Sequence, residues 1–448
     1  MTQLVRTLRL RDLLLLFIGS VIGSGIFLAP GIILRQLHGS VGLSMIVWLA
    51  GGILSLLGAL TYSELAAANP EAGGLYCYIR DGFGRLPAFL YGWCLFLVIA
   101  GATIAALARA FVQYLAEIVP LTSLEATLLA VLMIAVVTVV NIRGTRESSD
   151  LQNWTTLIKA GLVVLLSAVL LSMGHHASDV VADHGSSMHG YALFSAFGLA
   201  MIAVLWAYEG WQFGTYSAGE VVDPQKAFPK AFLYGSLMLV VLYITAVTAY
   251  LLALGPAAAT ASDAIAATAA RAVLGPWAGK FVAAAILISV FSSANSVVLT
   301  APRVFYAMAK DNLFFKTLAE VHPRFRTPAA AILALGIWAA LLTCAGKFYE
   351  LVEGVIFVGW IFYGLAAAAI FPLRRSLAGR PLPYRVPGYP WTPLVFVLVA
   401  AAIVGNAIYL AFRNPVQFRD LVVAIALLVL GLPAYAFWRW QARQRSAA

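Results

Sequence analysis

The chain has 448 residues, of which 62% are apolar and only 11% are charged. Soluble domains average about 45–50% apolar and about 25% charged residues, so this composition excludes a soluble protein. The net charge of +10 does not indicate nucleic-acid binding, because the basic residues are scattered at the ends of apolar segments and form no stripe.

Twelve apolar segments have roughly the length of a membrane-crossing helix, which is about 20 residues. In chain order they run over residues 13–37, 43–67, 87–118, 124–140, 157–173, 193–221, 231–254, 277–309, 329–345, 351–371, 394–412 and 421–438. We therefore expect an all-α integral membrane protein with twelve transmembrane helices.

The basic residues predict how these helices are oriented. If the N-terminus is cytoplasmic, the inner segments carry 20 Lys or Arg residues and the outer segments carry 6. The positive-inside rule then places both termini in the cytoplasm. No small-residue cleavage site accompanies the first span, so we expect it to stay attached as a helix and not to be removed as a signal peptide.

Cysteine and histidine usage gives no sign of a cofactor. Cys77, Cys94 and Cys344 are far apart and predict neither a disulfide framework nor a metal knuckle. The segment 174–190 contains His and Asp at irregular spacing, which is more typical of a solvated polar loop than of a zinc site. We expect no metal and no other cofactor.

Two spans contain residues that do not suit a continuous membrane helix. The first carries GSVIGSGIF (Gly19–Phe27), and the sixth carries WAYEGW (Trp206–Trp211). A glutamate near mid-bilayer costs about 3 kcal/mol on insertion scales. Taken singly, the first motif also fits close helix packing through the GxxxG pair, and the second fits an aromatic packing layer with a paired glutamate.

Together, the two motifs favour a transport site. Irregular backbone at membrane depth is tolerated where it lines a cavity, and broken helices at corresponding positions of two halves are typical of transporters. The half-helix that begins near Gly25 would direct free amides and its positive dipole end at an anion. Carbonyls freed from the preceding half could accept hydrogen bonds from an ammonium. This combination predicts recognition of the main-chain part of an α-amino acid.

The spacing of the breaks predicts the domain organisation. Helices 1 and 6 are five apart, which suggests that helices 1–5 are repeated, inverted, in helices 6–10. We expect one domain over 1–448, with a first repeat at 13–173, a second at 193–371 and two appended helices at 394–438.

Four separated motifs resemble those of the amino acid–polyamine–organocation superfamily, and within it the L-type amino acid transporter branch. They are GSGIF at Gly23–Phe27, NPEAGGLYCYIRDGFG at Asn69–Gly84, WAYEGW followed by GEVVDPQKAFPKA at Gly219–Ala231, and YRVPGYPWTP at Tyr384–Pro393. The resemblance implies a LeuT-like fold with a five-plus-five inverted repeat plus two helices. It also implies amino acid transport, commonly by exchange, in a bacterial member of the branch.

The resemblance also implies roles for individual residues. The Gly23 segment would bind the substrate carboxylate through the backbone amides of Ser24, Gly25 and Ile26. The amine would be bound by carbonyls near Ile18, Gly19 and Val21, together with Trp206 and Ala207. Trp206 would in addition close over the substrate, and Val98 and Ile99 of helix 3 would form an apolar wall.

Lys159 lies within helix 5, where an unpaired ammonium would be costly. In related transporters that lack sodium coupling, a helix 5 lysine stands in for a sodium ion and bridges helices 1 and 8. The resemblance assigns Lys159 this role, with Ser292 and Ser293 of helix 8 as its partners, and implies sodium-independent transport. The alternative is a lysine that snorkels to the inner surface.

Glu209 replaces the glycine that is common in members with neutral substrates, and some relatives that accept cationic substrates have an acidic residue there. A fixed carboxylate near the side-chain pocket would favour cationic substrates. Alternatively, Glu209 is protonated or pairs with Arg109 of helix 3. Cationic substrates, neutral substrates or both therefore remain open, as does exchange against proton-coupled symport of amino acids or polyamines.

Other functional classes and partners are less well supported. A membrane enzyme would need paired carboxylates or a metal cluster at one face, and a channel would need a repeated selectivity motif. Animal members of the branch link to a glycoprotein through a cysteine between helices 3 and 4, whereas this loop, Val119–Glu125, has none. We expect a protein that works alone, as a monomer, in the lipid bilayer of a bacterial inner membrane and without a disulfide-linked subunit.

Charged residues near the inner face have structural interpretations. We expect Glu64 and Glu71 to pair with Arg80 or Arg85, and Arg303 to snorkel toward the inner surface.

Overall fold

The computed structural model describes residues 4–181, 189–345, 348–379 and 381–447, and these parts of the chain form helices joined by short connections. Residues 182–188 of the polar loop predicted at 174–190 lie outside the described residues. Within them, His176 contacts Asp179 at 2.7 Å.

The first half contains α1 (Leu10–Val21), α2 (Gly25–Gln36), α3 (Val41–Ala68), α4 (Leu75–Phe83), α5 (Arg85–Cys94), the π-helical η1 (Leu95–Ala100), α6 (Gly101–Ala116), α7 (Ser123–Arg143) and α8 (Thr145–Met173). The second half contains α9 (Ala177–Val181), α10 (Gly190–Ala207), the 3₁₀-helical η2 (Trp211–Glu220), α11 (Pro224–Ala261), α12 (Ile265–Leu274), α13 (Pro276–Thr300), α14 (Pro302–Lys310), η3 (Lys316–Ala319), α15 (Ala329–Ala345), α16 (Phe348–Ala368) and α17 (Ile370–Ser376). The chain ends with α18 (Trp391–Ala411) and α19 (Pro415–Ala447).

These helices account for the twelve predicted spans. Ten helical stretches of the described chain are long and apolar enough to cross a membrane, and α1 with α2 form an eleventh that is bent by 41°. The shorter apolar helix α15, with 17 residues, occupies the remaining predicted position. The protein is therefore a multi-pass, all-α membrane protein, as its composition predicts.

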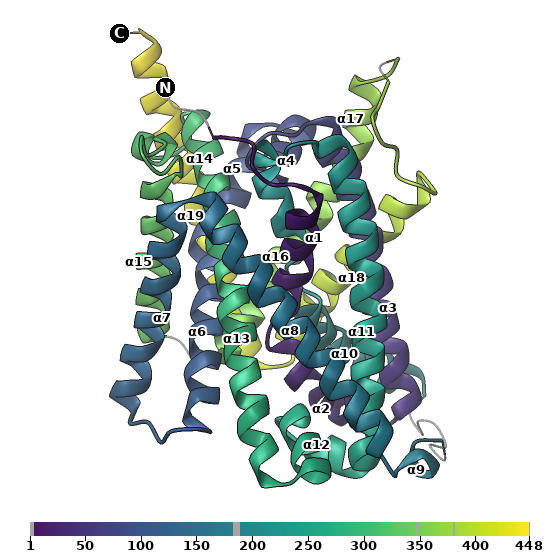
Figure 1. The fold of residues 1–448 in the computed structure, drawn as a ribbon. Helices are drawn as coiled ribbons and strands as arrows, with labels where there is room; N and C mark the ends of the chain where they lie inside the picture. The colour runs from purple at the N-terminus through teal and green to yellow at the C-terminus, as the bar shows by residue number, and fades with distance from the viewer. Residues whose placement is uncertain (1–3, 182–188, 346–347, 380, 448) are drawn as a thin grey trace.

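Both termini lie at one end of the helix bundle, together with the short helices α4, α14 and α17, while α2, α9 and α12 lie at the opposite end (Figure 1). We call these ends the terminal face and the distal face. An even number of spans requires the two ends of the chain to lie on one side, which agrees with the twelve helices.

The two broken helices lie inside the bundle. α1 and α8 pack against each other and against α13, while α3 and α11 pack along each other. The lipid-facing side of α8 is apolar, with Trp154 and Leu165 more than half exposed, whereas polar residues on its other side are buried. The outer helices α18 and α19 are the least buried of the spans.

Glycines fix the positions of both breaks. Helix 1 ends at Val21 because Ile22, with ψ of 89°, leaves the helical region. A Cβ on Gly25 would lie 2.4 Å from the Cα of Ala207, so only glycine lets the second half-helix start against helix 6. Gly210 has φ of +116°, which favours glycine, and a Cβ there would lie 2.7 Å from the carbonyl oxygen of Ser20. The two breaks therefore pack directly on each other.

Candidate functional site

A cavity lies where the breaks of helices 1 and 6 meet, and the volume in it that the centres of water-sized spheres can occupy is about 30 Å³. It is lined by Ser20, Val21, Gly23, Ser24, Gly25, Thr103, Leu107, Trp206, Glu209, Phe213, Ser293 and Val297. Glu209 is the only charged residue in this lining. The cavity is thus enclosed by the two broken helices on one side and by α6 and α13 on the other.

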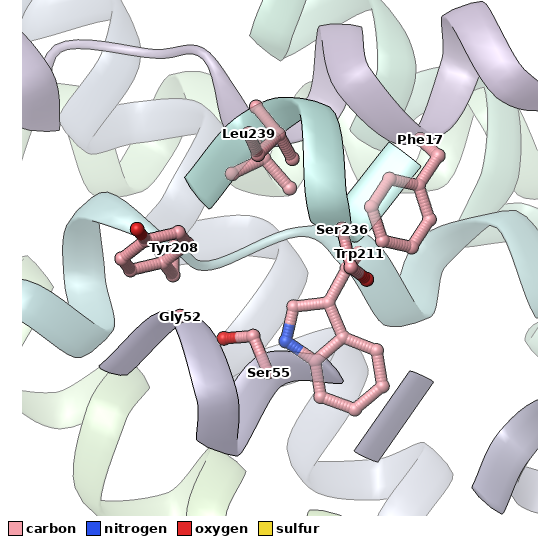
Figure 2. A pocket seen from close by; sticks show the side chains of 8 residues that line it. Phe17, Gly52, Ser55, Tyr208, Trp211, Ser236 and Leu239 are labelled. Atoms are coloured by element: carbon pink, nitrogen blue, oxygen red, sulfur yellow. The ribbon is translucent and has the colours of Figure 1, made fainter. Parts of the chain in front are cut away.

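A second, smaller cavity, which has no room for a water molecule, lies between α1, α3, α11 and the break of helix 6 (Figure 2). The apolar side chains of Phe17, Trp211 and Leu239 are part of its lining. Val21 is the only residue that lines both cavities. The smaller cavity lacks the helix N-terminus that makes the first one suitable for an anion.

Backbone amides at the start of α2 are free to bind a ligand. The first amides of a helix have no intrahelical acceptor. In the described chain, the amide of Phe27 bonds to the carbonyl of Ser24 at 3.1 Å, while those of Ser24, Gly25 and Ile26 have no acceptor. The hydroxyl of Ser24 is likewise buried without a partner. These donors and the positive end of the helix dipole make this point a potential carboxylate site.

Carbonyl groups freed by the two breaks are already partly occupied. Tyr243 of α11 donates its hydroxyl to the carbonyls of Val21 and Ala207, at 3.1 Å each. Ser289 of α13 donates to the carbonyls of Ile22 and Gly23 at 3.0 and 3.2 Å. A carbonyl oxygen has two lone pairs, so that of Val21 can still accept from a ligand amine. Tyr243 thus stabilises both breaks at once.

Lys159 of α8 fills the space between α1 and α13, which are parts of the first and eighth predicted spans. Its ammonium donates to the carbonyls of Gly19 at 2.5 Å and Ile22 at 2.6 Å, and to the hydroxyl of Ser293 at 3.2 Å. The carbonyl of Ser289 lies at 3.3 Å. The side chain is 1% exposed, so it is inserted among oxygen acceptors and does not snorkel. Four oxygens from α1 and α13 therefore surround this one cation.

Ser292 does not take part in this bridge. The structure places its hydroxyl 2.8 Å from that of Thr155, so the prediction that it contacts Lys159 is corrected. The reason is the helical period of α13. Ser289 and Ser293 are four residues apart and share the face that points to α1, whereas Ser292 contacts Thr155 of α8.

Glu209 lies within the break of helix 6, between α10 and η2, and is 7% exposed. Its Oε1 accepts hydrogen bonds from Tyr363 of α16 at 2.6 Å and from Gln212 at 2.5 Å. Arg109 instead donates to Thr127 at 3.4 Å, so the alternative pairing with Arg109 is absent from the described chain. Both donors hold one carboxyl oxygen and leave Oε2 without a protein partner among the described residues.

The apolar wall predicted in helix 3, the span formed by α5, η1 and α6, lies further along the chain than predicted. Val98 and Ile99 do not line the cavity, whereas Thr103 and Leu107 do. Val98 and Ile99 belong to η1, a π-helical turn. Such a turn contains more residues than an α-helical turn and rotates the side chains that follow it, which the sequence pattern does not reveal.

The remaining predicted residues lie around the cavity without lining it. Ile18, Gly19, Ile26, Ala207 and Lys159 are all buried and do not line the cavity. Ile26 still contributes a free amide. The predicted residues that do line the cavity are Val21, Gly23, Ser24, Gly25, Trp206, Glu209 and Ser293.

Two expectations about structural ion pairs also change. Arg303 does not snorkel, because it is 0% exposed and donates to both carboxylate oxygens of Glu220, at 2.6 and 3.0 Å. Glu64 pairs with Arg374 at 2.6 Å and not with a nearby arginine of the following loop. The pairing of Glu71 with Arg80, at 3.0 Å, agrees with the prediction.

Several residues that shape the site are not among those predicted from the sequence. Tyr243, Ser289, Gln212 and Tyr363 hold the groups that line the cavity, and Thr103 replaces the predicted wall. Two signals were present in the sequence: Ser289 lies one helical turn before Ser293, and Gln212 lies three residues after Glu209. The tyrosines come from distant helices and had no local signal.

An all-α bundle with two helices broken around a common cavity defines a secondary transporter of the LeuT-like class. Within that class, the chain belongs to the amino acid permease family, whose model matches residues 8–431. It is 33% identical over 429 residues to the serine/threonine exchanger SteT of Bacillus subtilis, which covers 94% of each chain.

Animal transporters are similar over most of the chain as well. Identity to the human large neutral amino acids transporter small subunit 2 is 29% over 95% of this chain and 79% of that protein. The rabbit b(0,+)-type amino acid transporter 1 is 31% identical over 85% of this chain and 79% of that protein. The predicted relationship to the L-type branch is thereby confirmed, as is the prediction of an amino acid transporter.

Proposed function

We propose that the protein exchanges α-amino acids across the membrane by alternating access and without sodium. The single observation that carries this proposal is the row of free amides at Ser24, Gly25 and Ile26 beside the cavity. Three amide donors at a helix N-terminus suit a carboxylate, which is a group that every α-amino acid carries.

The amine of the substrate would be bound on the other side of the break. The carbonyl of Val21 retains a lone pair next to the cavity, and the aromatic ring of Trp206 lines the same space. An ammonium is attracted both by a carbonyl oxygen and by the face of an indole ring. Trp206 is therefore assigned two roles, contact with the substrate and closure over it.

Lys159 supports the absence of sodium coupling. Its ammonium is already bound by the oxygen atoms between α1 and α13. A sodium ion would therefore have to displace a fixed positive charge. We assign to Lys159 and Ser293 the role of holding α1 in register with α13 during the transport cycle.

A second candidate is proton-coupled symport, which one observation favours. Glu209 is a buried carboxyl group at the cavity, and its Oε2 has no partner among the described residues. Such a group could carry a proton with the substrate. We rank exchange first because the relative SteT is named as an exchanger.

We further propose that the terminal face is cytoplasmic and that the protein lies in a bacterial inner membrane. The excess of Lys and Arg on the segments of this face supports that orientation. The loop between α6 and α7 has no cysteine, which supports activity without a disulfide-linked subunit.

Transport by purified protein in liposomes tests the function. Liposomes preloaded with one amino acid are expected to take up a labelled amino acid, and empty liposomes are not, with equal rates in sodium and in potassium buffers. Uptake into empty liposomes that depends on an inward pH gradient would favour symport. No uptake of any of the twenty amino acids or of common diamines, or a strict need for sodium, would contradict the proposal.

A further inference from the structure

Four buried polar side chains form a cluster that joins three spans away from both cavities. They are Asn141 of α7, Ser148 and Gln152 of α8, and Asn295 of α13, and each is at most 1% exposed. None of them lines either cavity. A buried amide or hydroxyl is costly unless it is hydrogen-bonded. The partners of this polar cluster therefore show which helices it holds together.

Asn295 lies at the centre of the polar cluster. Its Oδ1 accepts from Nδ2 of Asn141 at 2.8 Å, and its Nδ2 donates to Oε1 of Gln152 at 3.0 Å. The same Nδ2 donates to the backbone carbonyl of Ser148 at 3.3 Å. The hydroxyl of Ser148 lies 2.6 Å from Oδ1 of Asn141 and 3.2 Å from Oδ1 of Asn295. An asparagine amide has two donor hydrogens, so Asn295 uses both of them and its oxygen to join α7, α8 and α13.

These contacts fix the rotation of α13 about its own axis. Ser292, three residues before Asn295, contacts Thr155 of α8 at 2.8 Å, so two points one turn apart bind the same side of α13 to α8. Ser289 and Ser293 lie on the neighbouring side, which faces α1. A rotation by about 20° would move an oxygen that lies about 5 Å from the helix axis by about 2 Å. Such a displacement is enough to break a hydrogen bond.

The rotation of α13 matters because two of its serines hold the end of the first half of helix 1. The hydroxyl of Ser289 donates to the carbonyls of Ile22 at 3.0 Å and Gly23 at 3.2 Å. That of Ser293 donates to the carbonyl of Ile22 at 3.0 Å. The free amides of residues 24–26 follow directly in the chain. Their direction therefore depends on where α13 places these two hydroxyls.

α8 provides the fixed reference for this arrangement. Nε2 of Gln152 donates to the hydroxyl of Thr156 at 3.3 Å, and both side chains are buried. A Cβ on Gly19 would collide with both of them, so α1 packs directly on this part of α8. The packing holds α8 against α1, and Asn295 sets the position of α13 relative to α8.

We propose that Asn295 is a positioning residue of the transport site, which fixes the rotation of α13 and thereby directs the amides of residues 24–26 at the substrate carboxylate. The inference rests on the proposed function and adds to it a residue that does not touch the substrate. Because Asn295 acts on the part that all α-amino acids share, it sets the affinity for them and not the choice among their side chains.

Binding of a labelled amino acid to the purified protein tests this role. Asn295→Leu keeps a similar volume, removes every hydrogen bond of the amide, and is expected to raise Kd about tenfold, the change that corresponds to one lost hydrogen bond. The ratio of Kd for lysine to Kd for serine, measured by competition, is expected to stay within about twofold of its value in the unmodified protein. An unchanged Kd, or a ratio that changes as strongly as Kd itself, would overturn the proposal.

Thr300→Val is the matched control. Thr300 is equally buried in α13, but its hydroxyl bonds only within that helix, to the carbonyl of Ser296 at 2.7 Å. This variant is therefore expected to leave Kd within about twofold. An increase in Kd as large as that of Asn295→Leu would show that any lost hydroxyl or amide of α13 weakens binding, and would overturn the specific role of Asn295.

A second variant separates positioning from stability. Asn295→Leu leaves Asn141 with an unpaired buried amide, which lowers the melting temperature, whereas Asn141→Leu together with Asn295→Leu replaces both partners by apolar groups and is expected to restore part of it. Kd is expected to stay raised in this double variant, because apolar contacts are non-directional and fix no rotation. Recovery of Kd together with the melting temperature would show that Asn295 contributes only stability. If Asn295→Leu does not fold, the double variant alone gives the Kd.

A double-mutant cycle tests whether the effect passes through α13. In protein that carries Ser289→Ala and Ser293→Ala, adding Asn295→Leu is expected to change Kd less than about twofold, because the hydroxyls that it positions are already absent. A further tenfold increase would overturn this route. Failure of the unmodified protein to bind any amino acid would contradict the proposed function, whereas normal binding with an unchanged Kd in Asn295→Leu would overturn only the role of Asn295.

Discussion

Replacing Lys159 by alanine is expected to reduce amino acid exchange roughly 100-fold or more. The ammonium makes two short hydrogen bonds to the carbonyls of Gly19 and Ile22, and a hydrogen bond to a charged group contributes about 1.5–3 kcal/mol. The loss of two such bonds amounts to about 3 kcal/mol or more, and each 1.4 kcal/mol is a factor of ten. The initial rate of counterflow into preloaded liposomes measures the effect.

The control for this variant is Lys280→Ala, which removes an exposed lysine of α13 and should keep the rate within about twofold. Circular dichroism and size-exclusion elution establish that both variants are folded. Normal exchange in folded Lys159→Ala would show that helix 1 does not need this cation.

Replacing Glu209 by glutamine is expected to lower the ratio of kcat/KM for lysine or arginine to that for serine or leucine by about 10- to 100-fold. Oε2 has no partner among the described residues, and Glu209 is the only charged residue in the lining. A cationic side chain would therefore complete a buried ion pair, whereas a neutral one would not. Competition of each amino acid against labelled substrate measures the ratio.

Tyr363→Phe tests whether the hydroxyl of Tyr363 positions this carboxylate. It removes one of the two donors to Oε1 and is expected to lower the same ratio about three- to tenfold, the effect of one hydrogen bond. In Glu209→Gln the additional change to Tyr363→Phe should then have little further effect. The matched control is Tyr250→Phe, because the hydroxyl of Tyr250 is buried without a partner among the described residues. Equal losses for cationic and neutral substrates in Glu209→Gln would contradict a charge-selecting role.

The sequence predicts the membrane architecture well because one physical requirement dominates it, the internal hydrogen bonding of the backbone in hydrocarbon. Hydrocarbon requires every backbone group to be bonded within its own helix, so length and apolarity identify spans without tertiary information. The two breaks were also predictable, since Gly25 and Gly210 are needed where the backbones of helices 1 and 6 come into contact.

The details of the site depend on contacts between helices that are distant in the chain. The sequence pattern does not encode these contacts. Tyr243 and Tyr363 act through hydroxyl groups that arrive from α11 and α16, and nothing near them in the chain marks that role. Arg303 was predicted to snorkel because its partner Glu220 lies 83 residues away. The π-helical turn η1 likewise shifts the wall of helix 3 from Val98 to Thr103 without a local sequence signal.

The most direct test of main-chain recognition is a cryo-electron microscopy structure of the protein with the amino acid that it exchanges fastest. The account predicts density for the substrate carboxylate within hydrogen-bond distance, about 2.7–3.2 Å, of the amides of Ser24, Gly25 and Ile26, with its amine directed toward the carbonyl of Val21. Substrate density elsewhere in the bundle, with these amides still unbound, would contradict it.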